Sequence, residues 1–493
     1  MMYQIGISCG FHDAGLSVID PAGNIVFASH SERYSKQKHD PNLCLPLIED
    51  ALNYVYGPYQ IHYYEKPWLK LLRQIRARQP LTWPSAGKII GETVINCFNN
   101  SPIITHNHHK CHAAAGFQTS TFKDATIVII DAIGELDTIT IWDARYDSNG
   151  FAEYKKLWSK TYPNSIGLFY SAMTKHVGLK PLDEEYILMG MVAYGKPTVA
   201  NQISQSLIED FDNLKFKHNL HIGVKDNFLS NIDVMDIASS TQYVTENLIE
   251  IVMDKAASLS KSKNLVYGGG VALNCLANRL LGNYFDNIWI MPNPGDAGNS
   301  LGAASLGYGK QLEWHNAFLG KEIVGSYPVN AIIQELMTSK IVGVASGKAE
   351  FGPRALGNRS LLADPRGNEI KDKVNEIKRR QKFRPFAPVI LEELSSDYFD
   401  MPIGWNNSRY MQVVARCRHP DLFPAIVHYD GTSRVQTVPK DGTGIRQLLE
   451  VWFEKTGCPM LLNTSLNIRG EPMVNDRADA DRFEKLYNVK VIS

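Results

Sequence analysis

Four of the fourteen histidines fall within seven residues, in the segment His106-Asn107-His108-His109-Lys110-Cys111-His112. If this segment is helical, His108 and His112 project from one face, because residues four apart on a helix are neighbours. Two imidazoles at this spacing form a standard chelating pair, although a histidine standing alone is more often structural. The segment therefore predicts metal or phosphate chemistry, and a metal would need further ligands from elsewhere.

Two aspartates are the candidates for those ligands. Asp131 ends the apolar stretch 126–130, and ligand sites of α/β proteins gather at the carboxyl ends of strands. Asp296 lies just before a predicted helix over residues 299–308. Each aspartate could instead cap a loop or a helix N-terminus. With the two histidines they would form a set that suits a borderline metal such as iron or manganese.

A histidine also lies in the first loop of the chain. His12 stands between the predicted strand Tyr3–Ser8 and a second strand over residues 16–19. In a two-lobed protein this loop faces the ligand, and an imidazole there can accept a proton from a substrate hydroxyl. The alternative is a histidine that only satisfies its own loop.

Three consecutive glycines, Gly268, Gly269 and Gly270, separate a predicted strand from a predicted helix over residues 271–281. Backbone N–H groups at such a junction can approach an anion closely. A nucleotide or an acceptor substrate could lie there, and a plain tight turn would have the same sequence.

Basic residues are concentrated in two parts of the chain. Lys70 and Arg73 share a face of a predicted helix and could hold a phosphate, although the same spacing suits a solvated face or a nucleic-acid backbone contact. Later, Arg354 and Arg384 stand in stretches rich in glycine and proline, and Asn463-Thr464-Ser465-Leu466-Asn467 adds small polar groups. Arginines held in this way suit forked hydrogen bonds to phosphate or carboxylate, and ordinary surface arginines are the alternative.

The predicted elements indicate a repeated α/β architecture. Strands over Tyr3–Ser8, 16–19 and 25–28 are echoed by strands over 126–130 and 138–142, each set interrupted by short loops. Two such halves facing a cleft are typical of actin- and hexokinase-like folds. The character of the chain changes near residue 328, which predicts domains over residues 1–328 and 329–493.

Composition narrows the functional classes. The 493 residues contain 51 basic and 51 acidic side chains, which argues against a generally basic nucleic-acid binder but leaves a local basic patch open. No stretch reaches the roughly 18 apolar residues of a membrane helix, and the start does not resemble a secretory signal. Seven scattered cysteines without a CxxC pair fit free thiols, so we expect a cytoplasmic protein.

Together the motifs resemble the O-carbamoyltransferase family that includes the nodulation-factor, cephem and tobramycin carbamoyltransferases. The resemblance runs from about residue 5 to residue 475, nearly the whole chain. The motifs that carry it are FHDAGLSVID, SERYSKQKHD, HHKCHAA, IDAIGE, MGMVAYGKP, YGGGVALNC, NPGDAGNSLGAA, EFGPRALGNRSLLADPR, FRPFAP, DGTSRVQTV and NTSLNIRGEP.

The resemblance implies an N-terminal actin-like domain of the tRNA threonylcarbamoyl-transferring type and a C-terminal YrdC-like α/β domain. The second domain would form carbamoyl adenylate from carbamoyl phosphate and ATP, and the first would pass the carbamoyl group to an acceptor hydroxyl. In the first domain the resemblance implies that His12 is the general base and that an iron-type metal, with Mn²⁺ or Mg²⁺ as alternatives, is held by His108, His112, Asp131 and Asp296. It also implies that carbamoyl phosphate is handled by Lys38, Lys70 and Arg73 and that the nucleotide or acceptor lies beside Gly268, Gly269 and Gly270. The implied adenylate-forming site includes Arg354, Arg384, Arg434, Ser465 and Asn467.

The sequence leaves the acceptor and the assembly open. The acceptor could be a sugar hydroxyl of a small molecule or a hydroxymethyl group on a nucleotide or on DNA. A homodimer is a possible assembly. Departures such as Asp131-Ala132, where the family usually has Asp-Gly, bear on the acceptor more than on the chemistry. Two other functions stay open: a tRNA threonylcarbamoyladenosine-type enzyme, and a non-catalytic actin-like regulator that binds a nucleotide.

Overall fold

A computed structural model describes residues 2–381 and 386–493. The contacts divide the chain into two compact units, one of Met1–Ser35 with His39–Asn316 and one of Lys36–Lys38 with Ala317–Ser493. This division differs from the one predicted at residue 328 in two places. The second unit includes Lys36–Lys38, and it includes the strand β13 (Phe318–Ile323), which pairs with β15 (Gly347–Glu350). Both units are mixed α/β structures.

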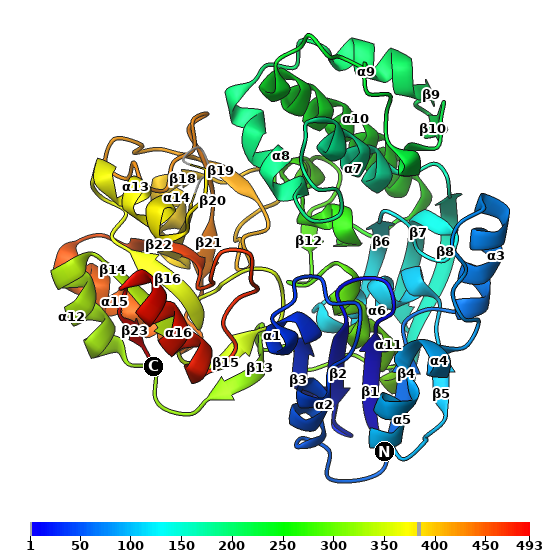
Figure 1. Ribbon diagram of the computed structural model, residues 1–493, viewed down its shortest axis with the longest axis horizontal. Coiled ribbons are helices and arrows are strands. Elements are labelled where there is room, and N and C mark those ends of the chain that lie inside the picture. Colours follow the sequence, from blue (N-terminus) through cyan, green and yellow to red (C-terminus); the bar gives the residue numbers. More distant parts are fainter. Residues whose placement is uncertain (1, 382–385) are drawn as a thin grey trace. The chain divides into compact units, whose positions relative to one another are not determined.

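The first unit contains two five-stranded sheets with the same strand order (Figure 1). In each sheet the first three strands are antiparallel, and the last two run parallel to the first. The repeat predicted from the sequence is therefore confirmed. The order of the first sheet is β3 (Ile25–His30), β2 (Gly15–Ile19), β1 (Tyr3–Ser8), β4 (Tyr59–Tyr63) and β5 (Ile103–Thr105); that of the second is β8 (Ala152–Thr161), β7 (Asp137–Tyr146), β6 (Asp124–Ile130), β11 (Asn264–Gly268) and β12 (Asn287–Trp289).

Two helices fill the space between these sheets. Helix α6 (His108–Thr119) follows the first sheet but packs on β6 and β11 of the second, whereas α11 (Asn299–Tyr308) follows the second sheet and packs on β1 and β2 of the first. The two helices also pack against each other. Glycine makes this close approach possible, since a Cβ on Gly302 would lie 2.0 Å from the carbonyl oxygen of Cys111.

The remaining helices of the first unit lie between strands. Figure 1 shows the group α7 to α10, in green, between β8 and β11 in the chain. The predicted helix over 271–281 is wrong: two short 3₁₀ segments, Gly270–Leu273 and Ala277–Asn283, stand there. The side chain of Asn278 donates to the carbonyl oxygen of Ala272, and such local bonds compete with a regular helix. The helices of this unit are α1 (Ser31–Ser35), α2 (Leu45–Leu52), α3 (Pro67–Ala77), α4 (Ala86–Ile90), α5 (Glu92–Cys97), α7 (Ile166–His176), α8 (Glu185–Met191), α9 (Ala200–Leu207) and α10 (Val234–Leu259).

The second unit is built on a six-stranded sheet. A small three-stranded sheet is formed by the strands that lie between β17 (Ala387–Leu391) and β21 (Gln436–Val438) in the sequence. The core of the unit combines aliphatic side chains with aromatic ones, among them the buried Trp452. The large sheet has the order β21 (Gln436–Val438), β17 (Ala387–Leu391), β22 (Met460–Ser465), β16 (Arg359–Ala363), β14 (Ile341–Ala345) and β23 (Val491–Ile492), and the small one contains β18 (Phe399–Asp400), β19 (Val414–Cys417) and β20 (Thr432–Arg434). The main helices are α12 (Val329–Ser339), α13 (Asn368–Ile377), α15 (Gly444–Thr456) and α16 (Arg477–Tyr487).

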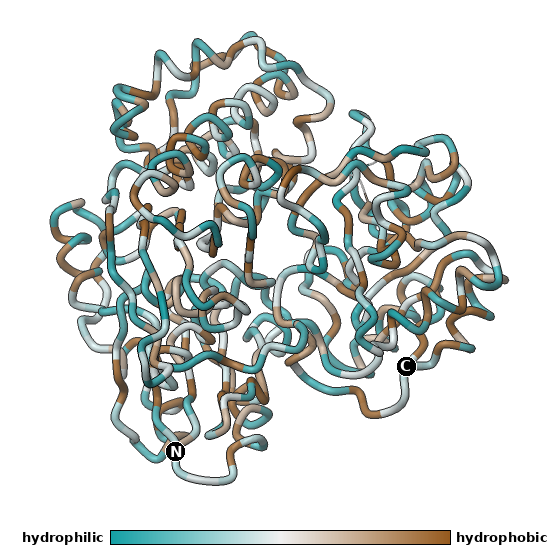
Figure 2. Tube along the Cα trace, turned by 180° about the vertical axis from the view of Figure 1, so that it is seen from behind, coloured by the Kyte–Doolittle hydropathy of each residue, from teal (hydrophilic) through white to brown (hydrophobic). Residues whose placement is uncertain are grey.

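Apolar and polar stretches alternate along the trace of both units (Figure 2). Strands such as β14 and β17 are buried along their whole length, which matches their continuous apolar sequences. Among the described residues, no helix is both long and apolar enough to cross a membrane.

Candidate functional site

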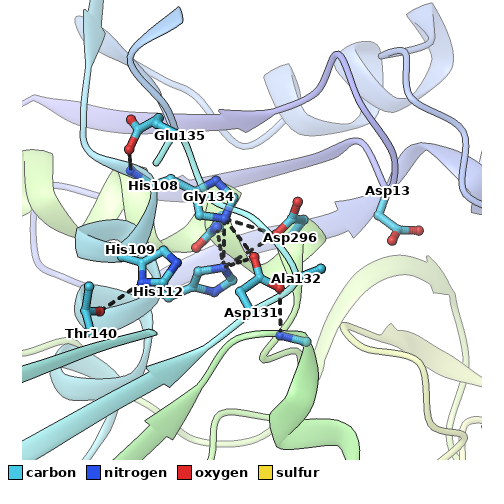
Figure 3. A network of polar contacts seen from close by, with 12 residues as sticks. Asp13, His108, His109, His112, Asp131, Ala132, Gly134, Glu135, Thr140 and Asp296 are labelled. Carbon is cyan, nitrogen blue, oxygen red and sulfur yellow. Dashed lines mark hydrogen bonds and ion pairs between the residues drawn. The ribbon is translucent and has the colours of Figure 1, made fainter. Parts of the chain in front are cut away.

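Four side chains predicted as metal ligands meet in the first unit (Figure 3). His108, His112, Asp131 and Asp296 are all buried, and their potential ligand atoms lie within 4.8 Å of one another. The two Nε2 atoms are 3.2 Å apart. The Nε2 atom of His108 lies 3.2 Å from Asp131 Oδ2 and 3.3 Å from Asp296 Oδ1. The structure thus brings together residues that are up to 188 positions apart, because 296 minus 108 is 188.

The beginning of α6 positions the two histidines. Asn107 caps the helix by accepting a hydrogen bond from the backbone N–H of Lys110. Glu135 accepts bonds from the backbone N–H of His108 at 3.1 Å and from the side chain of Asn107 at 2.7 Å. A carboxylate at this end is favoured by the helix dipole. Burial raises the pKa of Glu135 to about 7 despite the nearby charge of His108.

Glu135 is a residue that the sequence reasoning did not select. It lies in the acidic loop after β6 and also accepts a hydrogen bond from the backbone N–H of Lys66 at 2.7 Å. Its signals in the sequence are its place four residues after Asp131 and its position at the end of the motif IDAIGE. The contacts show that it orients the helix that carries the histidines.

The triple glycine positions Asp131. The backbone N–H of Gly270 donates to Asp131 Oδ1 at 3.2 Å. Gly269 has a φ of +88°, and a Cβ there would lie 2.2 Å from the carbonyl oxygen of Ile130. Only glycine allows the two strand ends to approach so closely. A nucleotide or acceptor beside Gly268 and its neighbours stays a prediction.

The turn before α11 supplies the last ligand candidate and one residue that the sequence reasoning missed. Asp296 begins a short 3₁₀ turn, Asp296–Gly298, that leads directly into α11. Asn299 follows it, and its Nδ2 atom lies 2.9 Å from His112 Nε2. In the sequence, its place three residues after Asp296 and within the motif NPGDAGNSLGAA hints at this role.

The charges in this cluster stabilise one another. Burial alone would lower the pKa of His108, but the carboxylates of Asp296 and Asp131 raise it well above its ordinary value. Burial would likewise raise the pKa of Asp131, yet hydrogen bonds from His108 and His112 hold it well below the usual range. Two buried carboxylates therefore lie next to two histidines, and a divalent cation bound by this set would take the place of the proton that the carboxylates favour on His108.

His12 lies at the edge of this cluster. Its Nε2 atom is 3.7 Å from Asp296 Oδ2, and its Nδ1 atom is 2.8 Å from Asp13 Oδ2. The loop between β1 and β2 therefore faces the cluster. Burial lowers the pKa of His12, but the bond to Asp13 and the charges of Asp296 and Asp131 outweigh burial and raise the pKa to about 9.

The basic face of α3 is not a solvated surface. Lys70 and Arg73 are both buried. Lys70 Nζ lies 2.9 Å from Glu65 Oε1, and Arg73 donates to the carbonyl oxygen of Gly134 at 2.7 Å. Arg73 thereby holds the loop that carries Asp131. The third residue predicted to handle carbamoyl phosphate, Lys38, belongs to the second unit.

In the second unit, Ser465 and Asn467 form a polar group with a lysine that was not among the predicted site residues. Ser465 Oγ donates to Asn467 Oδ1 at 2.7 Å. Lys378, at the end of α13, donates to Ser465 Oγ at 3.2 Å and also to Asn467 Oδ1. Lys378 is only 8% exposed, so its charge is directed at these two residues rather than at solvent.

The arginines predicted for the same site stand on segments that are tied together. Asn463, on the strand that ends at Ser465, donates to Gln436 at 2.7 Å and to the carbonyl oxygen of Ala355 at 3.0 Å. Arg354 and Arg434 are each within two residues of a member of this network. Arg384 lies outside the described residues.

The loop that carries Arg354 is shaped by Glu350. Its Oε1 atom accepts hydrogen bonds from the backbone N–H groups of Leu356, Asn358 and Arg359. Arg359 itself is fully buried and donates to the carbonyl oxygens of surrounding segments, among them Ser346 and Asn475. This arginine has a structural role in the fold of the second unit.

Comparison with known proteins places the chain among carbamoyltransferases. A family described as "Carbamoyltransferase N-terminus" matches residues 59–305, and one described as "Carbamoyltransferase C-terminus" matches residues 333–492. Nodulation protein NolO of Bradyrhizobium diazoefficiens is 33% identical over 76% of this chain and 75% of that protein. Nodulation protein NolNO of Sinorhizobium fredii is 29% identical over 95% of this chain and 76% of that protein.

Solved structures give weaker matches. Full-length HypF in a phosphate- and nucleotide-bound form is 12% identical, covers 62% of this chain and 55% of its own, and has a TM-score of 0.36. Component A of the (R)-2-hydroxyglutaryl-CoA dehydratase of Acidaminococcus fermentans is 15% identical, with coverages of 62% and 98% and a TM-score of 0.34. The family matches over both units therefore carry the assignment: the chain is an enzyme of the carbamoyltransferase family.

Proposed function

We propose that this protein is an ATP-dependent O-carbamoyltransferase with two half-reactions. In the first, carbamoyl phosphate, ATP and water give carbamoyl adenylate, pyrophosphate and phosphate. In the second, an acceptor hydroxyl takes the carbamoyl group and AMP leaves. The observation that carries the proposal is that His12 lies at the edge of a buried cluster of two histidines and two aspartates. The four cluster residues fall within residues 59–305, which match the carbamoyltransferase N-terminus.

The cluster fits a divalent metal. Two histidine side chains and two carboxylates converge in a buried space. Burying carboxylates away from water is costly unless a positive charge compensates them, and a metal ion would supply that charge. His108, His112, Asp131 and Asp296 would hold the ion, with iron or manganese suited to this mixture of ligands. Such an ion would supply positive charge that stabilises the phosphate of the departing AMP.

His12 would act as the general base of the transfer step. It stands 3.7 Å from Asp296 Oδ2, so an acceptor hydroxyl bound beside the cluster is within its reach. The carboxylates of Asp296 and Asp131 are among the causes that raise the pKa of His12 to about 9. A cation on those carboxylates would offset their charge and bring the pKa of His12 closer to neutral, where imidazole can accept a proton.

The second unit would form the adenylate in a YrdC-like site. Lys378, Ser465 and Asn467 present a cation and hydrogen-bonding groups together, which suits a nucleotide phosphate. Arg354, Arg384 and Arg434 are proposed to join them. Carbamoyl phosphate stays assigned to Lys38, Lys70 and Arg73, as the resemblance implies, and in the first unit Lys70 also pairs with Glu65.

The first unit is proposed to be actin-like, which the repeated strand order of its two sheets supports. The acceptor is proposed to be a small-molecule sugar hydroxyl or a hydroxymethyl group on a nucleotide or DNA. Acceptor binding that weakens steeply with salt would favour the polymer, because its phosphate backbone releases counterions on binding.

Pyrophosphate release from ATP tests the proposal. We expect release that depends on carbamoyl phosphate and needs no acceptor. Release with threonine and bicarbonate in place of carbamoyl phosphate would instead support a tRNA threonylcarbamoyladenosine-type enzyme. No turnover of ATP with either donor, in the presence of a panel of acceptors, would contradict both and favour a nucleotide-binding regulator.

A double variant assigns the first half-reaction to the second unit. Ser465→Ala with Asn467→Ala should abolish pyrophosphate release, because the hydroxyl and amide groups that Lys378 contacts are then lost. Asn406→Ala, at an exposed position of the same unit, is the matched control and should release pyrophosphate normally. Normal release by the double variant would remove these residues from the site.

A further inference from the structure

A chain of hydrogen bonds extends behind His12, away from the metal-ligand candidates. Asp13 Oδ2 lies 2.8 Å from His12 Nδ1, and Asp13 Oδ1 lies 2.7 Å from His39 Nδ1. The other ring nitrogen of His39 lies 3.0 Å from Asp183 Oδ1. All four residues belong to the first unit, and Figure 3 shows Asp13 to one side of Asp296.

The backbone is held in place at both Asp13 and His39, the two central residues of this hydrogen-bond chain. Asp13 and His39 both adopt left-handed conformations, with φ values of 53° and 54°. Such conformations are uncommon for residues other than glycine and persist where the surroundings hold them. The backbone N–H of Ala14 donates to the carbonyl oxygen of Asp40 at 2.7 Å, and that of Gly10 donates to Pro41 at 2.7 Å.

These two backbone bonds join the loop of His12 to the segment 39–41. The side chain of Glu32 adds a third restraint by accepting a hydrogen bond from the backbone N–H of His39 at 3.1 Å. His39 is therefore held by its backbone on one side and by Asp183 on the other. It can act as a fixed support for the carboxylate of Asp13.

The geometry at Asp13 determines which nitrogen of His12 faces the cluster. A carboxylate is an acceptor, so His12 Nδ1 must carry the proton in this bond. The other ring nitrogen, Nε2, then faces Asp296 Oδ2 at 3.7 Å and is available to accept the proton of an acceptor hydroxyl bound there. An imidazole backed by a carboxylate in this way keeps its ring orientation and its tautomer during proton transfer.

We propose that Asp13 is the positioning residue of His12 and that His39, held by Asp183, fixes Asp13 in turn. The proposal rests on the proposed function of His12 as the base. In the alternative, Asp13 and His39 would only stabilise the loop that carries His12, and their loss would not affect the transfer step selectively. The proposal also differs from a second cation site at Asp13, Glu32 and His39, whose potential ligand atoms lie within 4.8 Å of one another.

Asp13→Asn in the full-length protein tests the role of Asp13 in catalysis. Asparagine has the same shape and tolerates the left-handed backbone, but it cannot accept bonds with both of its terminal atoms. We expect kcat of carbamoyl transfer to fall on the order of 10²-fold, because a small misplacement of a catalytic group has an effect of this size. KM for the acceptor should stay unchanged. Pyrophosphate release that depends on carbamoyl phosphate should stay at the wild-type rate.

Three further variants make the result interpretable. His39→Gln should lower the same kcat about tenfold, and combining it with Asp13→Asn should add little, because both act through one chain of bonds. Asp20→Asn is the matched control: Asp20 also accepts bonds within a loop, from Ala22 and Asn24, but away from His12. It should leave both half-reactions unchanged. Full transfer by Asp13→Asn, or an equal loss in both half-reactions, would overturn the proposal.

A spectroscopic measurement decides the proposal even if the wild type transfers no carbamoyl group. The ring N–H of His12 that bonds to a carboxylate should give a downfield proton NMR signal, identified by its absence in His12→Asn. We expect Asp13→Asn to remove or shift this signal and Asp20→Asn to leave it in place. An unchanged signal in Asp13→Asn would contradict the proposal, whereas missing enzymatic activity of the wild type would bear on the proposed function alone. Wild-type binding of Mn²⁺ that depends on Glu32 would instead favour the cation site.

Discussion

The two halves of the first unit share a strand order but differ in the chemistry of their loops. The loop after β1 carries His12 and Asp13, whereas the loop after β6, at the equivalent place in the second sheet, carries Asp131 and Glu135. One loop offers a base with its supporting carboxylate. The other offers a metal-ligand candidate and a carboxylate that holds a helix. The same scaffold thus places two different kinds of groups at facing positions.

The helices show the same division. Helix α6, which follows the first sheet, contributes His108 and His112, and the turn before α11, which follows the second sheet, contributes Asp296. Neither half holds a complete ligand set. Because each helix packs on the sheet of the other half, the imidazoles and the carboxylates meet at the centre. A site of this kind depends on both halves being present and correctly packed.

The largest expected effect tests the loop of the first half. His12→Asn should lower carbamoyl transfer by about 10²–10⁴-fold, the usual contribution of general acid–base catalysis, and leave pyrophosphate release intact. The measurement is the rate of each half-reaction separately. Equal losses in both would mean that His12 supports the fold or the nucleotide site, and the contrast between the two loops would fail.

A stability measurement tests the second half. Gly269→Ala places a Cβ 2.2 Å from the carbonyl oxygen of Ile130 at a φ of +88°. Gly150→Ala is a matched control, with a φ of +79° but nothing within 4 Å of the added Cβ. Overpacking should make Gly269→Ala less stable than the control by about 1–3 kcal/mol. Equal melting temperatures would show that this turn tolerates a wider separation and does not fix Asp131.

The smallest effect is a pH dependence in the first half. Hydrogen bonds to Asp13 and Asp183 raise the pKa of His39 from 6.5 to about 10. A raised pKa stabilises the folded state fully below pH 6.5, and this stabilisation is lost as the pH rises toward 10. The melting temperature of wild type minus that of His39→Gln should therefore be largest near pH 6 and should shrink toward pH 10. A constant difference would contradict the ion pairs of His39.

The sequence predicts those parts of the site that depend on local spacing. The pair His108 and His112 needs only one helix, and the strand before Asp131 is continuous and apolar, so both are readable from the chain. The repeat of strands was also visible in the alternation of strands and loops. These features depend on neighbours in the sequence.

Features that depend on tertiary contacts were missed or misread. Glu135 and Asn299 both contact residues of α6, and Asn299 lies far from that helix in the chain. The spacing of Lys70 and Arg73 also suits a solvated helix face, but Glu65 and Gly134 cover these two side chains in the fold. Side-chain bonds of Asn278 replace the expected helix after the triple glycine.

Metal content measured with variants from each half tests the central claim most directly. Wild-type protein loaded with Fe²⁺ or Mn²⁺ and then freed of excess ions should retain one ion per chain. His108→Ala, from the first half, and Asp296→Ala, from the second, should each lose it while remaining folded by circular dichroism. Retention of the ion by either variant, or no retained ion in the wild type, would contradict a single metal site built jointly by the two halves.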